Sequence, residues 1–195
     1  RTRGLLFGTI ERLDHDSAAL ARGGRDALTG LRDAAAARRW IEVRLGGGKF
    51  YVLLFHITRF EMINAAFGRD TGDALLQSIA RQIGPLVSEL GGKRSIAART
   101  SGAEFIIGIE GAVELDRVVL LAEQLAAQVE RPQLTGAHLI ALSSRVGIIE
   151  NHGDDESVSD LLRRASAALA EAKVSADGRV LMVSHEKHEN AARDQ

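Results

Sequence analysis

Residues 55–76 read FHITRFEMINAAFGRDTGDALL and decide the fold. They follow on from an apolar run that begins at Phe50, which predicts a central β-strand over residues 50–57. A short helical segment, a turn at Gly68 and a longer helix come next. A strand that runs into a helix in this way is a common place for a nucleotide. Metal-assisted phosphate chemistry needs carboxylates there, whereas the strand ends in His56 and Thr58. The stretch therefore indicates either a working site or only its framework.

The long helix of this stretch is expected over residues 73–90, where apolar side chains recur at the helical period. The same test predicts further helices at residues 32–41, 59–66, 115–129 and 158–173. Strands are predicted at residues 50–57, 95–98, 105–109, 139–149 and 179–183. A helix followed by the order β-α-α-β-β-α-β-α-β predicts a mixed α/β (α+β) fold of the ferredoxin-like kind. Its centre would be a five-stranded, mainly antiparallel sheet flanked by helices.

The chain is expected to contain one folded domain between two flanking segments. Loose helical spacing indicates an N-terminal linker or signalling helix within residues 1–25. The domain itself is expected to span residues 26–183, and the polar run over residues 184–195 is interpreted as a C-terminal linker. Because the chain begins with Arg1 rather than Met, we expect it to be a piece of a longer protein.

The composition is that of one globular domain, with 195 residues of which 45% are hydrophobic. The absence of cysteine excludes disulfides and thiolate-bound metals and is typical of a reducing cytoplasm. A net charge of -1 gives no support for nucleic-acid binding. No apolar run approaches the roughly 20 residues of a membrane helix, so no membrane contact by this domain is expected.

Four short motifs follow one another along the chain: DALTGL at residues 26–31, RFEMIN with FGRDTGD within residues 59–73, RTSGAEF at residues 99–105 and ALAEAK at residues 168–173. Together they resemble the GGDEF domain family of diguanylate cyclases. The family patterns are roughly D-x-L-T-G-L-x-N-R, D-x-D-x-F-K-x-I-N-D with G-H-x-x-G-D, R-x-G-G-D-E-F and A-L-Y-x-A-K. The resemblance implies the nucleotidyl-cyclase fold. In that family two GTP molecules, one on each subunit of a dimer, become cyclic di-GMP with the help of a divalent metal.

The positions that hold the metal in this family are changed here. The signature GGDEF is replaced by Ser101, Gly102, Ala103, Glu104 and Phe105. The two metal-binding carboxylates correspond to His56 and Ala103, and a neutral imidazole is a poor Mg²⁺ ligand. A second strand-end acid has become Thr58, and the family lysine that contacts phosphate has become Glu61. Glu104 remains and is expected to be a structural hydrogen-bond acceptor. The resemblance therefore implies a degenerate member with no catalytic residues and no metal site.

Other positions of the family pattern are kept. Asn64 and Asp73 match the residues that read guanine, and Lys173 matches the lysine that reaches the phosphates. Each also has a structural interpretation, because Asn64 could end the short helix, Asp73 could cap the long one and Lys173 suits a last helical turn. Asp26 and Thr29 of the first motif are expected to fix the chain onto the domain with or without nucleotide.

The predicted function is that of a catalytically inactive regulatory or dimerisation module in a bacterial cyclic di-GMP signalling protein. The polar segment over residues 184–195 resembles the connector that precedes an EAL phosphodiesterase domain, so a sensor and an EAL-type domain of the same protein are the expected partners. No cofactor is required and Mg²⁺ is not expected. Three hypotheses stay open: a scaffold without nucleotide, a sensor that binds GTP weakly through Asn64 and Asp73, and an active diguanylate cyclase.

Overall fold

The computed structural model describes residues 24–151, 157–175 and 180–183. In this part of the chain, a five-stranded sheet has the strand order β2-β3-β1-β6-β7. Its strands are β1 (Phe50–Ile57), β2 (Ile96–Ser101), β3 (Glu104–Glu110), β6 (Ser144–Asn151) and β7 (Val180–Val183). All neighbours are antiparallel except β6 and β7, which are parallel. The predicted fold class and the mainly antiparallel five-stranded sheet are confirmed.

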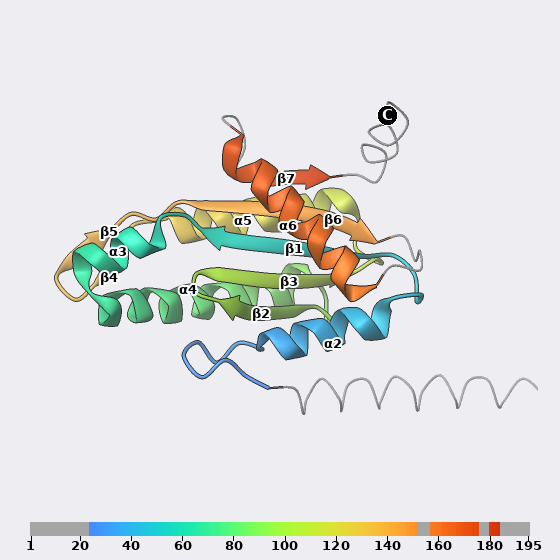
Figure 1. Cartoon of the computed structure of the whole chain (residues 1–195), viewed down its shortest axis with the longest axis horizontal. Coiled ribbons are helices and arrows are strands. Elements are labelled where there is room, and N and C mark those ends of the chain that lie inside the picture. The colour runs from blue at the N-terminus through green and yellow to red at the C-terminus, as the bar shows by residue number, and fades with distance from the viewer. Residues whose placement is uncertain (1–23, 152–156, 176–179, 184–195) are drawn as a thin grey trace, which may run out of the picture.

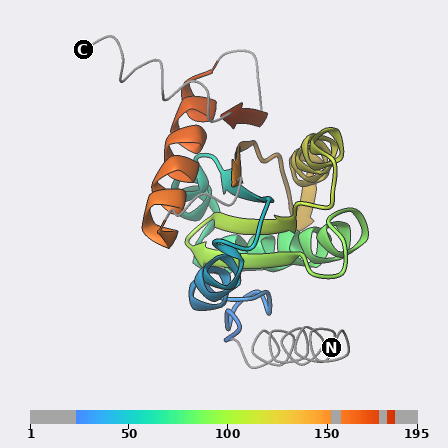
Figure 2. The ribbon, with the colours of Figure 1, turned by 90° about the vertical axis from the view of Figure 1, so that its right-hand side faces the viewer.

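The helices cover both faces of this sheet. They are α2 (Ala34–Arg44), α3 (Phe60–Phe67), α4 (Arg69–Leu90), α5 (Leu115–Glu130) and α6 (Val158–Val174). Figure 1 shows α6 in front of the sheet and α4 and α5 behind it, and in Figure 2 α6 and α5 lie on opposite sides. None of the described helices is long and apolar enough to cross a bilayer.

The side chains of β1 alternate between two hydrophobic cores. One set packs with α4 and α5 and the other with α2 and α6, since successive strand residues point to opposite faces. The first set contains Tyr51, Leu53, Phe55 and Ile57, and the second contains Phe50, Val52 and Leu54. Burying each large apolar side chain contributes about 1.5–3 kcal/mol, so a one-residue slip of β1 is strongly disfavoured. The same alternation puts His56 on the face covered by α2 and α6.

Helix α4 begins earlier than predicted, which rules out Asp73 as its N-cap. Gly68, with a φ of 87°, ends α3 and is also the N-cap of α4, which therefore starts at Arg69. That conformation is open to glycine and rare for other residues. Asp73 lies inside the helix and is exposed, so it does not cap it. Helix α3, expected over residues 59–66, runs to Phe67, so Asn64 lies inside it and does not end it.

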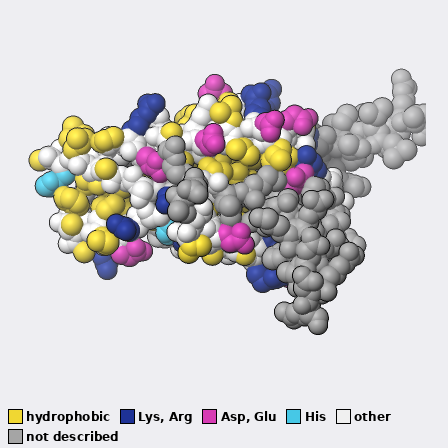
Figure 3. All heavy atoms as spheres, turned by 90° about the horizontal axis from the view of Figure 1, so that it is seen from above, with side chains coloured by type: hydrophobic (Ala, Val, Ile, Leu, Met, Phe, Trp, Pro, Cys, Tyr) yellow, Lys and Arg dark blue, Asp and Glu magenta, His cyan; other side chains and the backbone are white. Residues whose placement is uncertain are grey.

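The strand predicted over residues 139–149 is also wrong as a single element. A separate hairpin of β4 (Gln133–Thr135) and β5 (His138–Ile140) precedes β6, because Gly136 with a φ of 60° turns the chain back. Apolar side chains gather at the end of the molecule that α3 and this hairpin form (Figure 3). The large exposed ones there are Met62, Phe67, Leu134 and Leu139.

The two flanking segments cannot be compared with their predictions. The linker helix expected within residues 1–25 and the linker expected over residues 184–195 lie outside the described residues, apart from residues 24 and 25.

Candidate functional site

His56 lies at the end of β1 in a row of three polar residues that crosses the sheet. It is paired with Glu104 of β3 on one side and with Arg145 of β6 on the other. Side chains of residues directly opposite each other in paired strands point to the same face. The three side chains therefore gather on the face that α6 covers, at the position where the family pattern places its first metal ligand.

Close packing between α6 and β6 adds a fourth residue to this row. A methyl group on Gly147 would lie 2.4 Å from the backbone nitrogen of Leu169, so a larger residue would push the helix away. Because α6 connects the parallel strands β6 and β7, it runs opposite to β6. Lys173 is one helical turn beyond Leu169, and Arg145 is two residues before Gly147. These matching steps bring Lys173 over Arg145.

A pocket with a volume of about 530 Å³ opens at this corner. Its lining residues are His56, Thr58, Arg59, Ser143, Arg145 and Lys173. Thr58 ties two sides together, because its backbone N–H donates to the Ser143 carbonyl at 2.8 Å and the two hydroxyls are also in hydrogen-bond contact. Arg59 has a φ of 57°, a left-handed conformation that is rare outside glycine. Among the described residues, this lining contains the basic side chains of Arg59, Arg145 and Lys173 and no carboxylate.

The electrostatic surroundings of His56 keep its ring neutral near pH 7. Burial lowers the pKa of His56 below its usual value of 6.5, and the charge of Lys173 lowers it further. Glu104 and Glu61 act in the opposite direction without reversing the shift. His56 Nδ1 is buried and has no hydrogen-bond partner in the described ranges. The positive charge of the pocket therefore comes from its lysine and two arginines rather than from the imidazole.

The residues at this corner do not fit the divalent metal that the family resemblance implies. Mg²⁺ takes oxygen ligands, whereas His56 offers nitrogen. The Ala103 side chain is only 6% exposed and packs in the core formed with α4 and α5. The described residues contain no group of three or more His, Cys, Asp and Glu side chains suited to a metal. Three basic side chains around the pocket would also repel a divalent cation.

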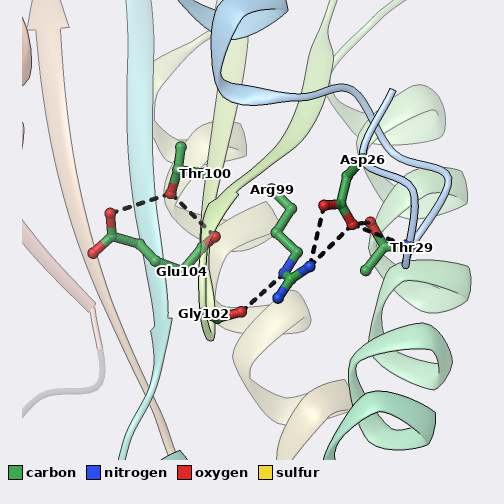
Figure 4. A network of polar contacts seen from close by, with 6 residues as sticks. All are labelled: Asp26, Thr29, Arg99, Thr100, Gly102 and Glu104. Atoms are coloured by element: carbon green, nitrogen blue, oxygen red, sulfur yellow. Dashed lines mark hydrogen bonds and ion pairs between the residues drawn. The ribbon is translucent and has the colours of Figure 1, made fainter. Parts of the chain in front are cut away.

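A polar network joins the first and third motifs (Figure 4). The Arg99 guanidinium donates to both carboxylate oxygens of Asp26 at 3.1 Å, and the Thr29 hydroxyl donates to the same carboxylate at 2.6 Å. Arg99 Nε also donates to the Gly102 carbonyl at 2.9 Å. Burial alone would raise the pKa of Asp26, but the hydrogen bonds from Thr29 and Arg99 outweigh it and hold the pKa below its usual value. The DALTGL turn is thus fixed to the turn that carries SGAEF.

Glu104 is held at the start of β3 by its own hairpin. The Thr100 hydroxyl donates to the Glu104 carboxylate at 3.3 Å and to its carbonyl at 3.2 Å (Figure 4). Ser101 and Glu104 are register partners, so Gly102 and Ala103 form the turn between β2 and β3. Glu104 therefore accepts a hydrogen bond inside the hairpin, as the sequence led us to expect.

Asn64 of α3 packs against Gly72 of α4, the residue before Asp73. A methyl group on Gly72 would lie 1.9 Å from Asn64 Oδ1, so the amide rests against the backbone just before Asp73. Asn64 Oδ1 is buried and has no hydrogen-bond partner among the described residues, while Asp73 is exposed. Neither residue lines the pocket that contains Lys173. The three kept family positions are thus divided between this helix junction and the basic pocket.

Arg59, Ser143 and Arg145 line the pocket although the sequence did not single them out. Arg145 carried a usable signal, since it interrupts the otherwise apolar end of the run LIALSSRVGII over residues 139–149. A charged residue within a buried strand usually has a specific reason to be there. The position of Arg59 varies within the family pattern, so its contribution depends on the left-handed turn that only the structure reveals.

A family model described as diguanylate cyclase, GGDEF domain, matches residues 24–179. The uncharacterized protein y4lL of Sinorhizobium fredii is 32% identical over 162 residues, which are 80% of this chain and 19% of that protein. The cyclic di-GMP phosphodiesterase NbdA of Pseudomonas aeruginosa is 26% identical over 170 residues, covering 84% of this chain and 21% of that protein. The chain therefore spans about a fifth of the length of these curated relatives.

Solved structures share the fold. The diguanylate cyclase SiaD of Pseudomonas aeruginosa, in complex with its activator SiaC, superposes with a TM-score of 0.71 at 23% identity, over 93% of this chain and 70% of that chain. The coiled coil and GGDEF domain of DgcB from Caulobacter crescentus, in complex with c-di-GMP, gives a TM-score of 0.71 at 22% identity, over 92% and 96%. Since the family model also covers most of the sequence, this chain belongs to the GGDEF domain family of cyclic di-GMP signalling.

Proposed function

We propose that this GGDEF domain does not make cyclic di-GMP and acts as a regulatory or dimerisation module. The observation that carries the proposal is the charge of the catalytic corner. Where the family pattern has two carboxylates for metal, this chain has the neutral His56 and the buried Ala103, beside a basic pocket. Attack of one GTP on another concentrates negative charge that bound metal normally neutralises. Without carboxylates at these two positions, the corner has no ligands for the metal that would orient and activate the attacking hydroxyl.

The relatives support a place within a longer signalling protein. NbdA is named a cyclic di-GMP phosphodiesterase, and MucR of the same organism is named a bifunctional diguanylate cyclase/cyclic di-GMP phosphodiesterase. MucR is 31% identical over 125 residues, which are only 18% of its length. By analogy, the present domain works in the cytoplasm, next to a sensor and an EAL-type phosphodiesterase domain, and pairs with a second copy of itself.

Regulation of this kind requires a ligand or partner that binds one state of the protein more tightly than another. Guanine nucleotide is one such ligand, because the Asn64 amide and the Asp73 carboxylate can pair with the edge of guanine. The contact of Asn64 with Gly72, next to Asp73 in the chain, and the unpartnered Asn64 Oδ1 support this assignment. A pure scaffold would use neither group.

Two measurements test the proposal. Incubation with GTP and Mg²⁺ is expected to leave GTP unchanged, and formation of cyclic di-GMP would overturn the inactive assignment. Calorimetric titration with GTP then separates the sensor from the scaffold. Saturable binding that disappears in Asn64→Ala supports a sensor, whereas no binding supports a scaffold. Since Asn64 Oδ1 has no hydrogen-bond partner in the described ranges, this substitution is expected to leave the fold intact.

A further inference from the structure

The pocket beside His56 is lined by basic side chains from three separate parts of the fold. Arg59 precedes α3, Arg145 belongs to β6 and Lys173 lies in the last turn of α6. We propose that this pocket binds the phosphate groups of an anionic ligand directly, without a divalent metal, and that Arg145 is the main contact. In this site, basic side chains that bind phosphate themselves would take the place of the divalent metal.

Arg145 has hydrogen-bonding capacity to spare. One of its terminal nitrogens donates to the Ser144 carbonyl at 2.8 Å. Its Nε is buried and has no hydrogen-bond partner among the described residues. A guanidinium offers five N–H donors in a planar fork that matches phosphate oxygens. The terminal N–H groups of Arg145 that the Ser144 carbonyl does not use can therefore donate to a phosphate group in the pocket.

The left-handed backbone at Arg59 supports the same assignment. This conformation is strained for a residue other than glycine and is often found at a binding site. Here the conformation occurs at a residue that lines the pocket, between the end of β1 and the start of α3. Arg59 is exposed, and its side chain makes no ion pair or hydrogen bond with the described residues, so it is available to a ligand.

The neighbouring carboxylates do not neutralise the pocket. Glu61 and Glu104 are near enough to influence His56, but neither lines the cavity. Glu104 is engaged by the Thr100 hydroxyl. A pocket walled by basic groups concentrates an anionic ligand and disfavours a metal cation. The charge distribution therefore favours phosphate without metal over metal-bound phosphate.

This inference deepens the proposed function and rests on it in one respect, since both require the corner to work without divalent metal.

The test is calorimetric titration of the chain with inorganic pyrophosphate in EDTA at low salt. Arg145→Gln and Lys173→Gln are each expected to weaken binding by about tenfold or more. Arg163→Gln is the matched control, because it removes the same charge from the far end of α6, about 15 Å from Lys173 by helical rise.

Saturable binding in EDTA that only the two pocket variants weaken would support the site. No binding in EDTA, binding that requires Mg²⁺, or an equal loss in all three variants would overturn it. Repeating the titration with GTP identifies the source of the phosphate. Tighter binding of GTP than of pyrophosphate indicates a nucleotide, and equal binding indicates the phosphate chain alone. The turnover assay is separate: cyclic di-GMP formation defeats the proposed function, while missing pyrophosphate binding without turnover defeats only this inference.

Discussion

His56 illustrates how one side chain changes what a strand end can bind. Its neighbours across the sheet, Glu104 and Arg145, would flank any residue at this position. An acid at this position would attract a cation to the corner. With a buried neutral imidazole there instead, the nearby basic groups determine the charge of the corner. The changes at His56 and Ala103 could both be found from the sequence, because they fall inside motifs of fixed spacing.

The titration of His56 makes a first prediction. Burial and Lys173 hold the pKa of His56 below 6.5 in the folded chain, so the unfolded chain binds the proton more tightly. Stability should therefore fall as pH drops below about 6.5 and stop falling below the folded pKa. Urea unfolding of the chain and of His56→Gln across this range measures the effect, and the stability difference between them should change with pH. A stability difference that stays constant with pH would contradict the lowered pKa of His56. His138→Gln is the control, because it removes an exposed imidazole.

Asp26 also has a lowered pKa, but for a different reason, because its contacts in the folded chain favour the charged form. Its contacts with Arg99 are largely shielded from solvent, with side chains 21% and 15% exposed. Asp26→Asn is expected to cost about 1–3 kcal/mol near neutral pH, since hydrogen bonds to charged groups are lost. Because the folded pKa lies below the usual 3.8, that contribution should persist above pH 3.8 and disappear as pH falls through the folded value.

Denaturant unfolding of Asp26→Asn measures this loss. Arg163→Gln breaks the exposed pair with Asp160 and should cost less, because solvent screens such pairs. Equal losses in the two variants would mean that the Asp26 network does not hold the first motif onto the domain.

Among the elements, those with a strong periodic pattern were predicted well. The helix expected over residues 115–129 is α5 (Leu115–Glu130), and the strand expected over residues 50–57 is β1. The errors occur where a glycine redirects the chain, at Gly68 before α4 and at Gly136 in the hairpin. Hydrophobic periodicity does not report such turns. The basic pocket could not be predicted either, because strand register decides that Arg145 lies beside His56.

The contact of α6 with β6 yields a prediction at this scale. The methyl group in Gly147→Ala meets the backbone of Leu169, which cannot rotate away. The variant is expected to lose about 1–3 kcal/mol of stability, and pyrophosphate binding should weaken because Lys173 moves with the helix. Gly84→Ala in α4 is the comparison, since its methyl meets only Leu31 at 3.7 Å and should change stability by about 1 kcal/mol or less.

Thermal or denaturant unfolding measures the stability of the two glycine variants, and the pyrophosphate titration measures their binding. If Gly147→Ala is as stable as Gly84→Ala and binds normally, close packing of α6 does not position the pocket.

For the molecule as a whole, the GGDEF fold is retained while its catalytic corner differs. The core, the hairpin turn and the Asp26 network hold the fold together through contacts within the chain. The helix junction at Asn64 and the basic pocket at Arg145 keep groups that a ligand can use. These features fit the proposed role, in which the domain transmits a signal without carrying out a reaction.

The most direct test of this account is product formation by the purified chain with GTP and Mg²⁺, followed by chromatography. The account predicts no cyclic di-GMP, with the same result when Mn²⁺ replaces Mg²⁺. An active diguanylate cyclase assayed in parallel verifies the conditions. Cyclic di-GMP that forms in this assay and is lost in Glu104→Ala would contradict the account.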